Sequence, residues 1–479
     1  MTLKRKHLVT QYVASMHEGE AALFIGAGMS RPAGFVDWRG LLRDCAQELG
    51  LDIDREHDLV AVAQYYLNHR NRDRGRLNQI LKNEFDRPGT FSKNHTVIGR
   101  LPIQTVWTTN FDSLLERAFW TEGRIVDVKS RDQSLATSTR GREVILYKMH
   151  GDIAMPDEAI ICKDDYERYA KKHPLIQNQL EADLINKTFL FLGFSFTDPH
   201  LDYMLSHLRT LLEDNKRTHY AVMRKVRLNI HHPDPEEAQR LFEYETNKQA
   251  LQIEDLQRYS IHTHLIDQYD EVTDILEQVE EYYYRKNVFV SGSAHEFGEF
   301  GEERLRDLCA QLGGRLMDRD CKLVSGFGLN VGDSAVHGAV LKLYEKGSPV
   351  LEKHLLLRPF PRNILPELDH EEFRQKYRQD MIARCGFALF VAGTSKTNPV
   401  SEGVWQEYKI ARRLRKIPIP VGATGFAARR IWEDVEAELE TVYAGAVSRE
   451  QFRLLNDPGL SNAQLLDAVF RIIDQVSAA

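Results

Sequence analysis

The sequence has few cysteines, and none of them is placed for a metal site or a disulfide framework. Five cysteines occur in 479 residues, and no two have Cys-x-x-Cys spacing. An odd number of scattered cysteines is not typical of a disulfide-stapled secreted domain or of a structural zinc site. We therefore expect a reducing, cytoplasmic environment and no bound metal.

Long apolar runs and an excess of positive charge are also missing. The longest apolar stretches, such as TFLFLGFSF, are far shorter than the roughly 20 residues that span a bilayer. The basic N-terminal segment lacks the continuous apolar core of an export signal. A net charge of −7 and a pI of about 6.2 disfavour general binding to nucleic acid. We expect no membrane partner and no nucleic-acid partner.

Alternating strand and helix patterns fill the first half of the chain. Short apolar segments that end in glycine or a polar residue are typical of buried parallel strands. Such segments occur at 21–26, 105–110, 144–151, 188–195 and 219–223. The helical patterns between them indicate an α/β fold. The helical stretch from 37 to 100 is longer than one crossover and predicts a helical insertion.

A second set of strand patterns follows a charged amphipathic helix predicted at about 269–285. These strands are expected at 287–293, 321–328, 354–361, 385–393 and 417–425. A chain of this length exceeds one ordinary core. We therefore predict an α/β protein with two Rossmann-like domains, each a mainly parallel sheet flanked by helices, the first with a helical insertion. Their expected bounds are 1–283 and 284–479.

Four strand ends in the first half carry glycine or polar residues. They contribute Gly26, Ala27, Gly28 and Ser30; Asn110 and Asp112; His150; and Gly193 and Ser195. Taken singly, each also suits a tight turn or a helix cap. The carboxyl ends of parallel strands share one edge, where α/β ligand sites lie. A glycine loop at that edge can bring backbone N–H groups close to a pyrophosphate.

This ordered set resembles the sirtuin family over most of residues 15 to 270. The matching elements are Gly-Ala-Gly-Met-Ser (26–30), Thr-Thr-Asn-Phe-Asp (108–112), His-Gly (150–151) and Gly-Phe-Ser (193–195). The resemblance implies that NAD is bound as substrate. It places the pyrophosphate near Gly26 and Gly28, the nicotinamide ribose near Asn110 and Asp112, and His150 as catalytic base.

Sirtuin deacylases carry two Cys-x-x-Cys pairs in a zinc module that shapes the acyl-lysine cleft, and this chain has no such pair. Water is therefore the expected acceptor, and the expected activity is that of an NAD+ hydrolase (NAD+ glycohydrolase). His150 and Asn110 are the candidate catalytic residues. The alternatives are a sirtuin-type protein deacylase, a non-enzymatic nucleotide sensor, and a nucleotide N-glycosidase in the second half.

In the second half, two strand ends form glycine-rich loops suited to a phosphate or nucleotide. The candidate ligand residues of the two loops are Gly292, Ser293, Ser325, Gly326 and Gly328. Arg378 precedes a later strand and could clamp phosphate oxygens, while Glu407 follows that strand and could accept from ribose hydroxyls. Ordinary turns and a solvated surface pair are the alternatives.

These loops resemble the SLOG superfamily of nucleotide-binding Rossmann-like domains. The VSGFGLNVGDSA segment lacks the Pro-Gly-Gly-x-Gly-Thr-x-x-Glu element of the N-glycosidase relatives, which favours sensing. The order sirtuin-like, then SLOG, resembles the NAD-consuming effectors of bacterial Thoeris antiphage systems. That resemblance implies a homo-oligomer, a tetramer or higher assembly, that a cyclic ADP-ribose isomer activates. The same resemblance implies that a partner TIR-domain protein makes the isomer and that NAD depletion follows.

Overall fold

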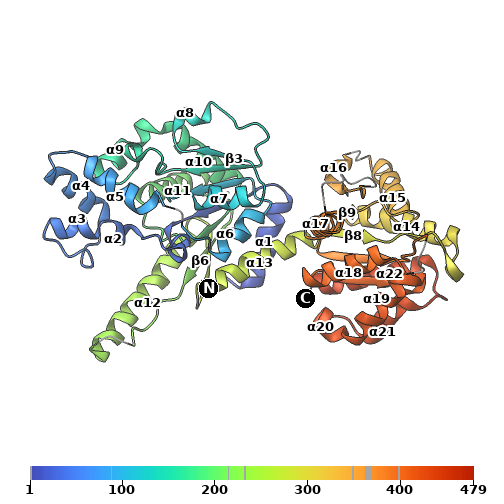
Figure 1. Ribbon diagram of the computed structural model, residues 1–479. Helices are drawn as coiled ribbons and strands as arrows, with labels where there is room; N and C mark the ends of the chain where they lie inside the picture. The colour runs from blue at the N-terminus through green and yellow to red at the C-terminus, as the bar shows by residue number, and fades with distance from the viewer. Residues whose placement is uncertain are drawn as a thin grey trace. The chain divides into compact units, whose positions relative to one another are not determined.

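The computed structural model describes residues 3–87, 89–213, 215–230, 233–347, 350–361, 369–396 and 400–478. The chain divides into two compact units, Met1–Glu280 and Glu281–Ala479. The division falls inside helix α13 (Asp270–Tyr284), which is continuous (Figure 1). The boundary predicted from the sequence lies in the same helix.

The first unit is built on a sheet of seven strands in the order β3-β4-β2-β1-β5-β6-β7, and every pairing is parallel. The strands are β1 (Ala21–Ile25), β2 (Thr105–Thr108), β3 (Val126–Lys129), β4 (Val144–Lys148), β5 (Thr188–Leu192), β6 (His219–Arg224) and β7 (Ile261–Ile266). The chain leaves β1 toward β2 and later returns past it to β5. The strand order therefore reverses between β1 and β5, where open parallel sheets bind ligands.

Within the described residues, thirteen α-helices accompany this sheet, and α13 is included in that number. They are α1 (Arg5–His17), α2 (Trp38–Leu41), α3 (Arg43–Glu48), α4 (Leu59–His69), α5 (Gly75–Phe85), α6 (Lys93–Arg100), α7 (Leu114–Thr121), α8 (Asp132–Leu135), α9 (Lys163–Lys172), α10 (Pro174–Asn186), α11 (Pro199–Leu212), α12 (Pro235–Gln257) and α13. Helices α2 to α6 lie between β1 and β2, which confirms the predicted helical insertion. Buried side chains from α2 to α5 form their own apolar cluster with residues from the sheet edge.

The second unit has five parallel strands in the order β10-β9-β8-β11-β12, with the reversal between β8 and β11. Its strands are β8 (Asn287–Ser291), β9 (Lys322–Ser325), β10 (Leu355–Leu357), β11 (Phe387–Val391) and β12 (Ile417–Val421). Its helices are α14 (Glu302–Asp318), α15 (Gly332–Glu345), α16 (Leu351–His354), α17 (His370–Ile382), α18 (Glu402–Arg413), α19 (Phe426–Ala437), α20 (Leu439–Tyr443), α21 (Arg449–Arg453) and α22 (Asn462–Ala478). The predicted fold class of two parallel α/β sheets is confirmed.

All ten predicted strands are present, but two strands were missed. Most of the predicted strands end a few residues earlier than expected, because their terminal glycine and polar residues belong to the loops of the carboxyl edge. The missed strands are β3 and β7, which form the two edges of the first sheet. Strand β7 buries only three of its six residues, so its apolar signal is weak.

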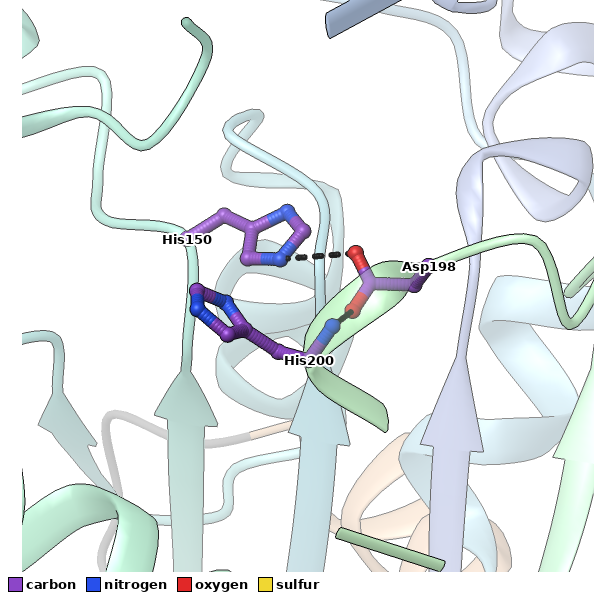
Figure 2. Close-up of side chains that lie close together, drawn as sticks. All are labelled: His150, Asp198 and His200. Atoms are coloured by element: carbon purple, nitrogen blue, oxygen red, sulfur yellow. Dashed lines mark hydrogen bonds and ion pairs between the residues drawn. The ribbon is translucent and has the colours of Figure 1, made fainter. Parts of the chain in front are cut away.

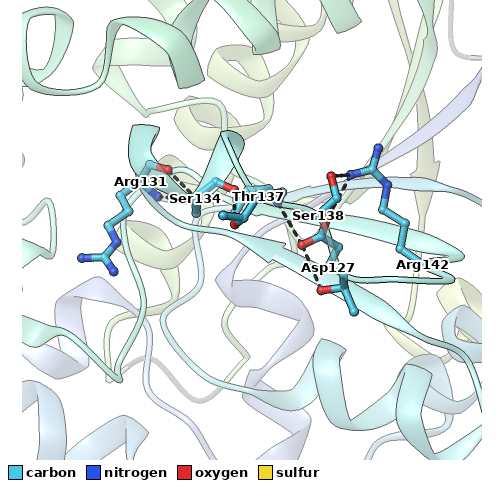
Figure 3. Close-up of polar contacts among 8 residues, drawn as sticks. Asp127, Arg131, Ser134, Thr137, Ser138 and Arg142 are labelled. Atoms are coloured by element: carbon cyan, nitrogen blue, oxygen red, sulfur yellow. Dashed lines mark hydrogen bonds and ion pairs between the residues drawn. The ribbon is translucent and has the colours of Figure 1, made fainter.

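Strand β3 carries a buried charged network in place of an apolar pattern. Asp127 and Lys129 are 4% and 3% exposed, and Lys129 Nζ lies 2.9 Å from Asp127 Oδ1. Arg142 Nη1 donates to Asp127 Oδ2 at 3.0 Å (Figure 3). Lys129 also donates to the carbonyls of Ser134 and Thr137. Burial raises the pKa of Asp127, but the neighbouring Lys129 and Arg142 outweigh it and lower that pKa. The network holds the loop after β3 against the sheet.

Two neighbouring glycines of α14 offer a test of how closely this helix packs on α15. A Cβ at Gly313 would lie 1.9 Å from the carbonyl oxygen of Ala335, whereas at Gly314 the nearest atom is 3.7 Å away. We expect Gly313→Ala to lower the free energy of unfolding by about 1–3 kcal/mol through overpacking. Gly314→Ala should leave it unchanged or raise it by up to about 1 kcal/mol, since alanine favours helix.

The measurement is denaturant unfolding of both variants of the full chain beside the wild type. Equal stabilities for the two variants would show that α14 and α15 can move apart at little cost.

Candidate active site

The loops after β1 and β5 touch backbone to backbone. The N–H of Gly28 donates to the carbonyl of Gly193 at 3.0 Å, and the N–H of Gly26 donates to Leu192 at 2.9 Å. A Cβ on Gly26 would lie 2.4 Å from the Gly193 oxygen, so only glycine fits there. Both amides donate within the protein in this structure. A phosphate contact for Gly26, Ala27 or Gly28 therefore stays a prediction.

Asn110 lies at the centre of a buried polar chain beside this loop. Its Nδ2 donates to Ser30 Oγ at 3.0 Å and to the Gly26 carbonyl at 3.2 Å. Ser30 Oγ in turn donates to Asp112 Oδ2 at 2.7 Å. Asn110 is 7% exposed, and its Oδ1 is buried with no hydrogen-bond partner among the described residues. A buried acceptor without a partner costs free energy unless a ligand donates to it.

A pocket opens beside Asn110. Its polar lining residues are Ser30, Thr109, Asn110 and Asp112, and Ala27 of the glycine loop lies with them. Its remaining lining residues are apolar: Val36, Trp38, Leu41, Phe85 and Phe111. Trp38 and Leu41 belong to α2 and Phe85 to α5, so the helical insertion supplies much of the apolar wall. Its lining therefore combines hydrogen-bonding groups with apolar and aromatic side chains, the mixture that is typical of small-molecule sites.

His150 follows the strand next to the one that leads to Asn110. Thr108 pairs in register with Lys148, so Asn110 and His150 each lie two residues beyond paired strand positions. His150 is 1% exposed, and its Nε2 lies 3.1 Å from Asp198 Oδ2 (Figure 2). Within the described part of the chain neither ring nitrogen has a partner in hydrogen-bond geometry. The Asp198 contact is therefore an ion pair only when both nitrogens of the imidazole carry a hydrogen.

Asp198 is held in place from several directions. As the N-cap of α11, its Oδ1 accepts from the N–H groups of His200 and Leu201 at 3.1 and 3.0 Å. Its Oδ2 accepts from the Tyr166 hydroxyl at 3.1 Å. Burial raises the pKa of Asp198, but the charge and contact of His150 outweigh it and lower that pKa to about 2. Asp198 is thus a fixed carboxylate that can orient an imidazole.

Sequence reasoning missed Asp198, although Asp198-Pro199 carries the signal of a helix start three residues after Ser195. No local sequence pattern shows that Asp198, the N-cap of α11, also faces His150. Ser195 lies exposed on the same loop, where its hydroxyl is 2.7 Å from Thr197 Oγ1. Neither Gly193 nor Ser195 lines the pocket at Asn110. Their part in ligand binding stays a prediction.

The candidate ligand residues of the second unit gather at the end of β8. Ser291 Oγ donates to Glu407 Oε2 at 2.5 Å, and Arg378 Nε lies 3.7 Å from Glu407 Oε1. The Arg378 guanidinium also lies over the ring of Phe360, 4.9 Å from its centroid. Burial raises the pKa of Glu407, against the opposing effects of Ser291 and Arg378. Arg378 and Glu407 therefore form one cluster and are not an exposed surface pair.

The two glycine loops of the second unit meet at this same edge. A Cβ on Gly328 would lie 1.9 Å from the Gly292 oxygen. The Ser293 carbonyl accepts from Gly393 and Thr394 at 3.0 and 2.8 Å, which ties the loop after β8 to that after β11. The Ser325 hydroxyl accepts from the N–H of Phe327 at 3.1 Å, and Gly326 packs near Met381 of α17. These loop residues build the turns at the strand ends, and their contact with a ligand stays a prediction.

Comparison with known families agrees with this two-part architecture. A family model described as a SIR2-like domain matches residues 104–248. A second model, described as the Sir2- and TIR-associating SLOG family, matches residues 271–476. The resemblances to sirtuins and to SLOG domains are therefore confirmed.

Relatives match the chain over nearly its whole length. The protein named NAD(+) hydrolase ThsA of Bacillus cereus (strain MSX-D12) is 41% identical over 474 residues, 98% of each chain. The protein of the same name from Acinetobacter baumannii (strain 532279) is 37% identical over 481 residues, again 98% of each chain. That of Cytobacillus dafuensis is 35% identical over 485 residues, which cover 100% of this chain and 98% of the relative.

The chain belongs to the ThsA family. In this member of the family, none of the helices searched in the described residues is long and apolar enough to cross a membrane.

In this ThsA-family chain, a buried lysine fixes the turn that carries Asn110 and Asp112. Lys148 is fully buried at the end of β4, and its Nζ donates to the carbonyls of Phe111 and Asp112 at 3.1 and 2.8 Å. The same Nζ lies 2.8 Å from Glu116 Oε1 and 2.8 Å from Asp152 Oδ2. Burial lowers the pKa of Lys148, but the two carboxylates outweigh it and raise that pKa.

The two carboxylate partners of Lys148 differ in their surroundings. Burial raises the pKa of Glu116 more than Lys148 lowers it. The side chain of Asp152 is 16% exposed and that of Glu116 only 6%, so Asp152 is the better solvated of the two carboxylates. Lys148 thus joins the end of β4 to the turn after β2, and it was missed by sequence reasoning.

We expect Lys148→Met to destabilise the chain by about 3–5 kcal/mol, because it leaves Asp152 and two buried carbonyls without their partner. Lys225→Met is the matched control: its ion pair with Asp267 has side chains that are 48% and 65% exposed. That control should lose no more than about 1 kcal/mol. Denaturant unfolding of the full chain measures both, and equal losses would contradict the role given to Lys148.

Proposed function

We propose that the first unit hydrolyses NAD+ at the nicotinamide–ribose bond to give nicotinamide and ADP-ribose. The observation that carries this proposal is the unpartnered Asn110 Oδ1 in a half-apolar pocket, next to the His150–Asp198 pair. Full-length relatives named NAD(+) hydrolase support it.

The pocket divides the substrate by polarity. The apolar wall around Trp38 and Phe111 would receive the nicotinamide ring. Asn110 Oδ1 would accept from a ribose hydroxyl or from the attacking water, with Asp112 and Ser30 beside it. The remaining loop residues, proposed to contact the pyrophosphate and the ribose, are Gly26, Ala27, Gly28, Gly193 and Ser195.

The chemistry needs orientation and one proton acceptor more than it needs a strong acid. Nicotinamide leaves NAD+ as a neutral molecule, so bond cleavage produces an oxocarbenium-like ribose without protonation of the leaving group. Water then attacks the ribose and loses a proton. With Nε2 of His150 facing the Asp198 carboxylate, Nε2 carries the hydrogen and Nδ1 is the base. Asp198 stabilises the imidazolium that forms.

A protein deacylase remains the second candidate, because the sirtuin-like sheet alone does not distinguish the two acceptors. The two activities differ in one readout: a deacylase releases nicotinamide only when an acyl-lysine peptide is present. Nicotinamide release from NAD+ in water, unchanged by added acyl-lysine peptide, would favour hydrolysis.

His150→Ala and Asn110→Ala should each reduce NAD+ cleavage by about 10²–10⁴-fold, since each removes a group that positions or accepts a proton. The control is His207→Ala: His207 faces Glu181 at 3.7 Å with 44% of its side chain exposed, outside the pocket. Nicotinamide and ADP-ribose are quantified by chromatography. Near-normal turnover in a folded His150→Ala protein would overturn the assignment.

We further propose that the second unit is the sensor that controls this activity. The Ser291–Glu407–Arg378 cluster combines a cation for phosphate oxygens with a carboxylate for hydroxyls. The ligand we propose is a cyclic ADP-ribose isomer made by a TIR-domain partner protein. It activates a homo-oligomer, a tetramer or higher assembly, whose NAD+ depletion stops an infected cell. The ligand must bind the active state more tightly than the inactive one, since equal affinity shifts nothing.

Arg378→Ala should shift the ligand concentration needed for activation roughly 10- to 150-fold upward, because a charge-assisted contact contributes about 1.5–3 kcal/mol. Arg374→Ala, an exposed position on the same helix α17, is the control and should leave the titration unchanged. The measurement is NAD+ loss against the concentration of cyclic ADP-ribose isomers. Coincident curves for Arg378→Ala and wild type would show that Arg378 does not contact the signal.

A further inference from the structure

Two histidines and one carboxylate converge at the carboxyl edge of the first sheet, and none of the three is among the residues that line the pocket at Asn110. The ligand-capable atoms of His150, Asp198 and His200 all lie within 4.8 Å of one another. Figure 2 shows the two imidazole rings close to each other, both on one side of the Asp198 carboxylate. The set contains no cysteine and therefore has no relation to the zinc module that the sequence lacks.

The free nitrogen of His200 is prepared to bind a cation. Its Nε2 lies 3.0 Å from the Tyr166 carbonyl, which assigns the hydrogen to Nε2 and the lone pair to Nδ1. Nδ1 is buried and, among the described residues, has no hydrogen-bond partner. A histidine that donates one N–H to a carbonyl and offers the other nitrogen is the usual arrangement of a metal ligand.

The surroundings also fix the other two donors. Asp198 is ionised and held by the Tyr166 hydroxyl and by the N-terminal amides of α11. Both ring nitrogens of His150 are buried without hydrogen bonds to any described group. Rings of Tyr166 and Tyr169 stack near His200 at 4.6 and 4.1 Å, so the cluster has little freedom to relax. Imidazole and carboxylate donors suit zinc, whereas magnesium prefers oxygen alone.

We propose that His150, Asp198 and His200 form a three-ligand binding site for Zn²⁺, and that zinc bound there inhibits the enzyme. The inhibition rests on the proposed function, while the binding does not. Zinc takes the lone pair of His150 Nε2 in place of the hydrogen that faces Asp198. The hydrogen then resides on Nδ1, which can no longer accept a proton from water. Zinc also neutralises the carboxylate that stabilises the imidazolium.

The experiment uses the metal-free full chain and two independent readouts. Zinc binding is measured by competition with a chromogenic chelator, and Co²⁺ absorption reports the ligand geometry. NAD+ cleavage is followed in the same zinc titration, with a cyclic ADP-ribose isomer present as activator. We expect one zinc per chain, loss of cleavage over the same concentration range, recovery with EDTA, and no effect of Mg²⁺.

Matched variants locate the site. Tyr166→Phe removes an outer hydrogen bond and should weaken zinc binding by about 10–100-fold. His200→Phe keeps a ring beside Tyr166 but removes a ligand, so it should bind zinc more weakly still and should cleave NAD+ without zinc inhibition. His200→Gln serves the same purpose if the phenylalanine variant does not fold. His207→Ala, on the same helix α11, should behave as the wild type.

The outcomes separate the two parts of the inference. Zinc affinity unchanged in both His200→Phe and His150→Ala, or no stoichiometric zinc, would overturn the site. Stoichiometric zinc at the site with full NAD+ cleavage would overturn the inhibition. If the metal-free wild type did not cleave NAD+ with the activating cyclic ADP-ribose isomer present, the proposed function would fall, and the chelator competition would still decide the site.

Discussion

The contact between the loops after β1 and β5 is the constraint on which the candidate active site depends. Gly26 and Gly28 lie directly against the backbone of Gly193, with no side chain between them. This close approach lets the chain after β5 continue over the ends of β1 and β2. Asp198 thereby reaches His150, which follows β4 on the other side of β2. A Cβ at either glycine would lift the loop and separate the pair.

The second unit uses the same construction with different chemistry. Gly328 lies against the Gly292 carbonyl, and Gly292 in turn lies against the carbonyl of Val391. The strand ends of β8, β9 and β11 are thereby drawn together around Ser291, and Glu407 and Arg378 approach from α18 and α17. In the second sheet these polar groups lie at the reversal of strand order, whereas in the first they extend from the reversal at β1 and β5 across β2 to the end of β4.

Buried charge gives the first site its rigidity. Lys148 is surrounded by two carboxylates and two carbonyls, and Asp198 by an imidazole, a hydroxyl and two amides. Charges in the weakly polar interior of a protein interact strongly and are costly to leave unpaired, so each group resists displacement. A site prearranged in this way suits a reaction whose leaving group departs without being protonated. The same fixed donors explain why a metal could compete for His150.

The sequence by itself determined the two sheets, the helical insertion and the positions of Asn110, Asp112 and His150 at strand ends. Those features follow from local rules: apolar segments form buried strands, and parallel strands share one carboxyl edge. Tertiary structure alone decided three further features. They are the pairing of His150 with Asp198, the apolar lining around Trp38, and the contact of Lys148 with the Asp112 carbonyl. Asp198 and His150 are 48 residues apart and meet only because a glycine contact directs one loop across two strands. Such a contact depends on the separation of two backbones in space, which no spacing along the chain encodes.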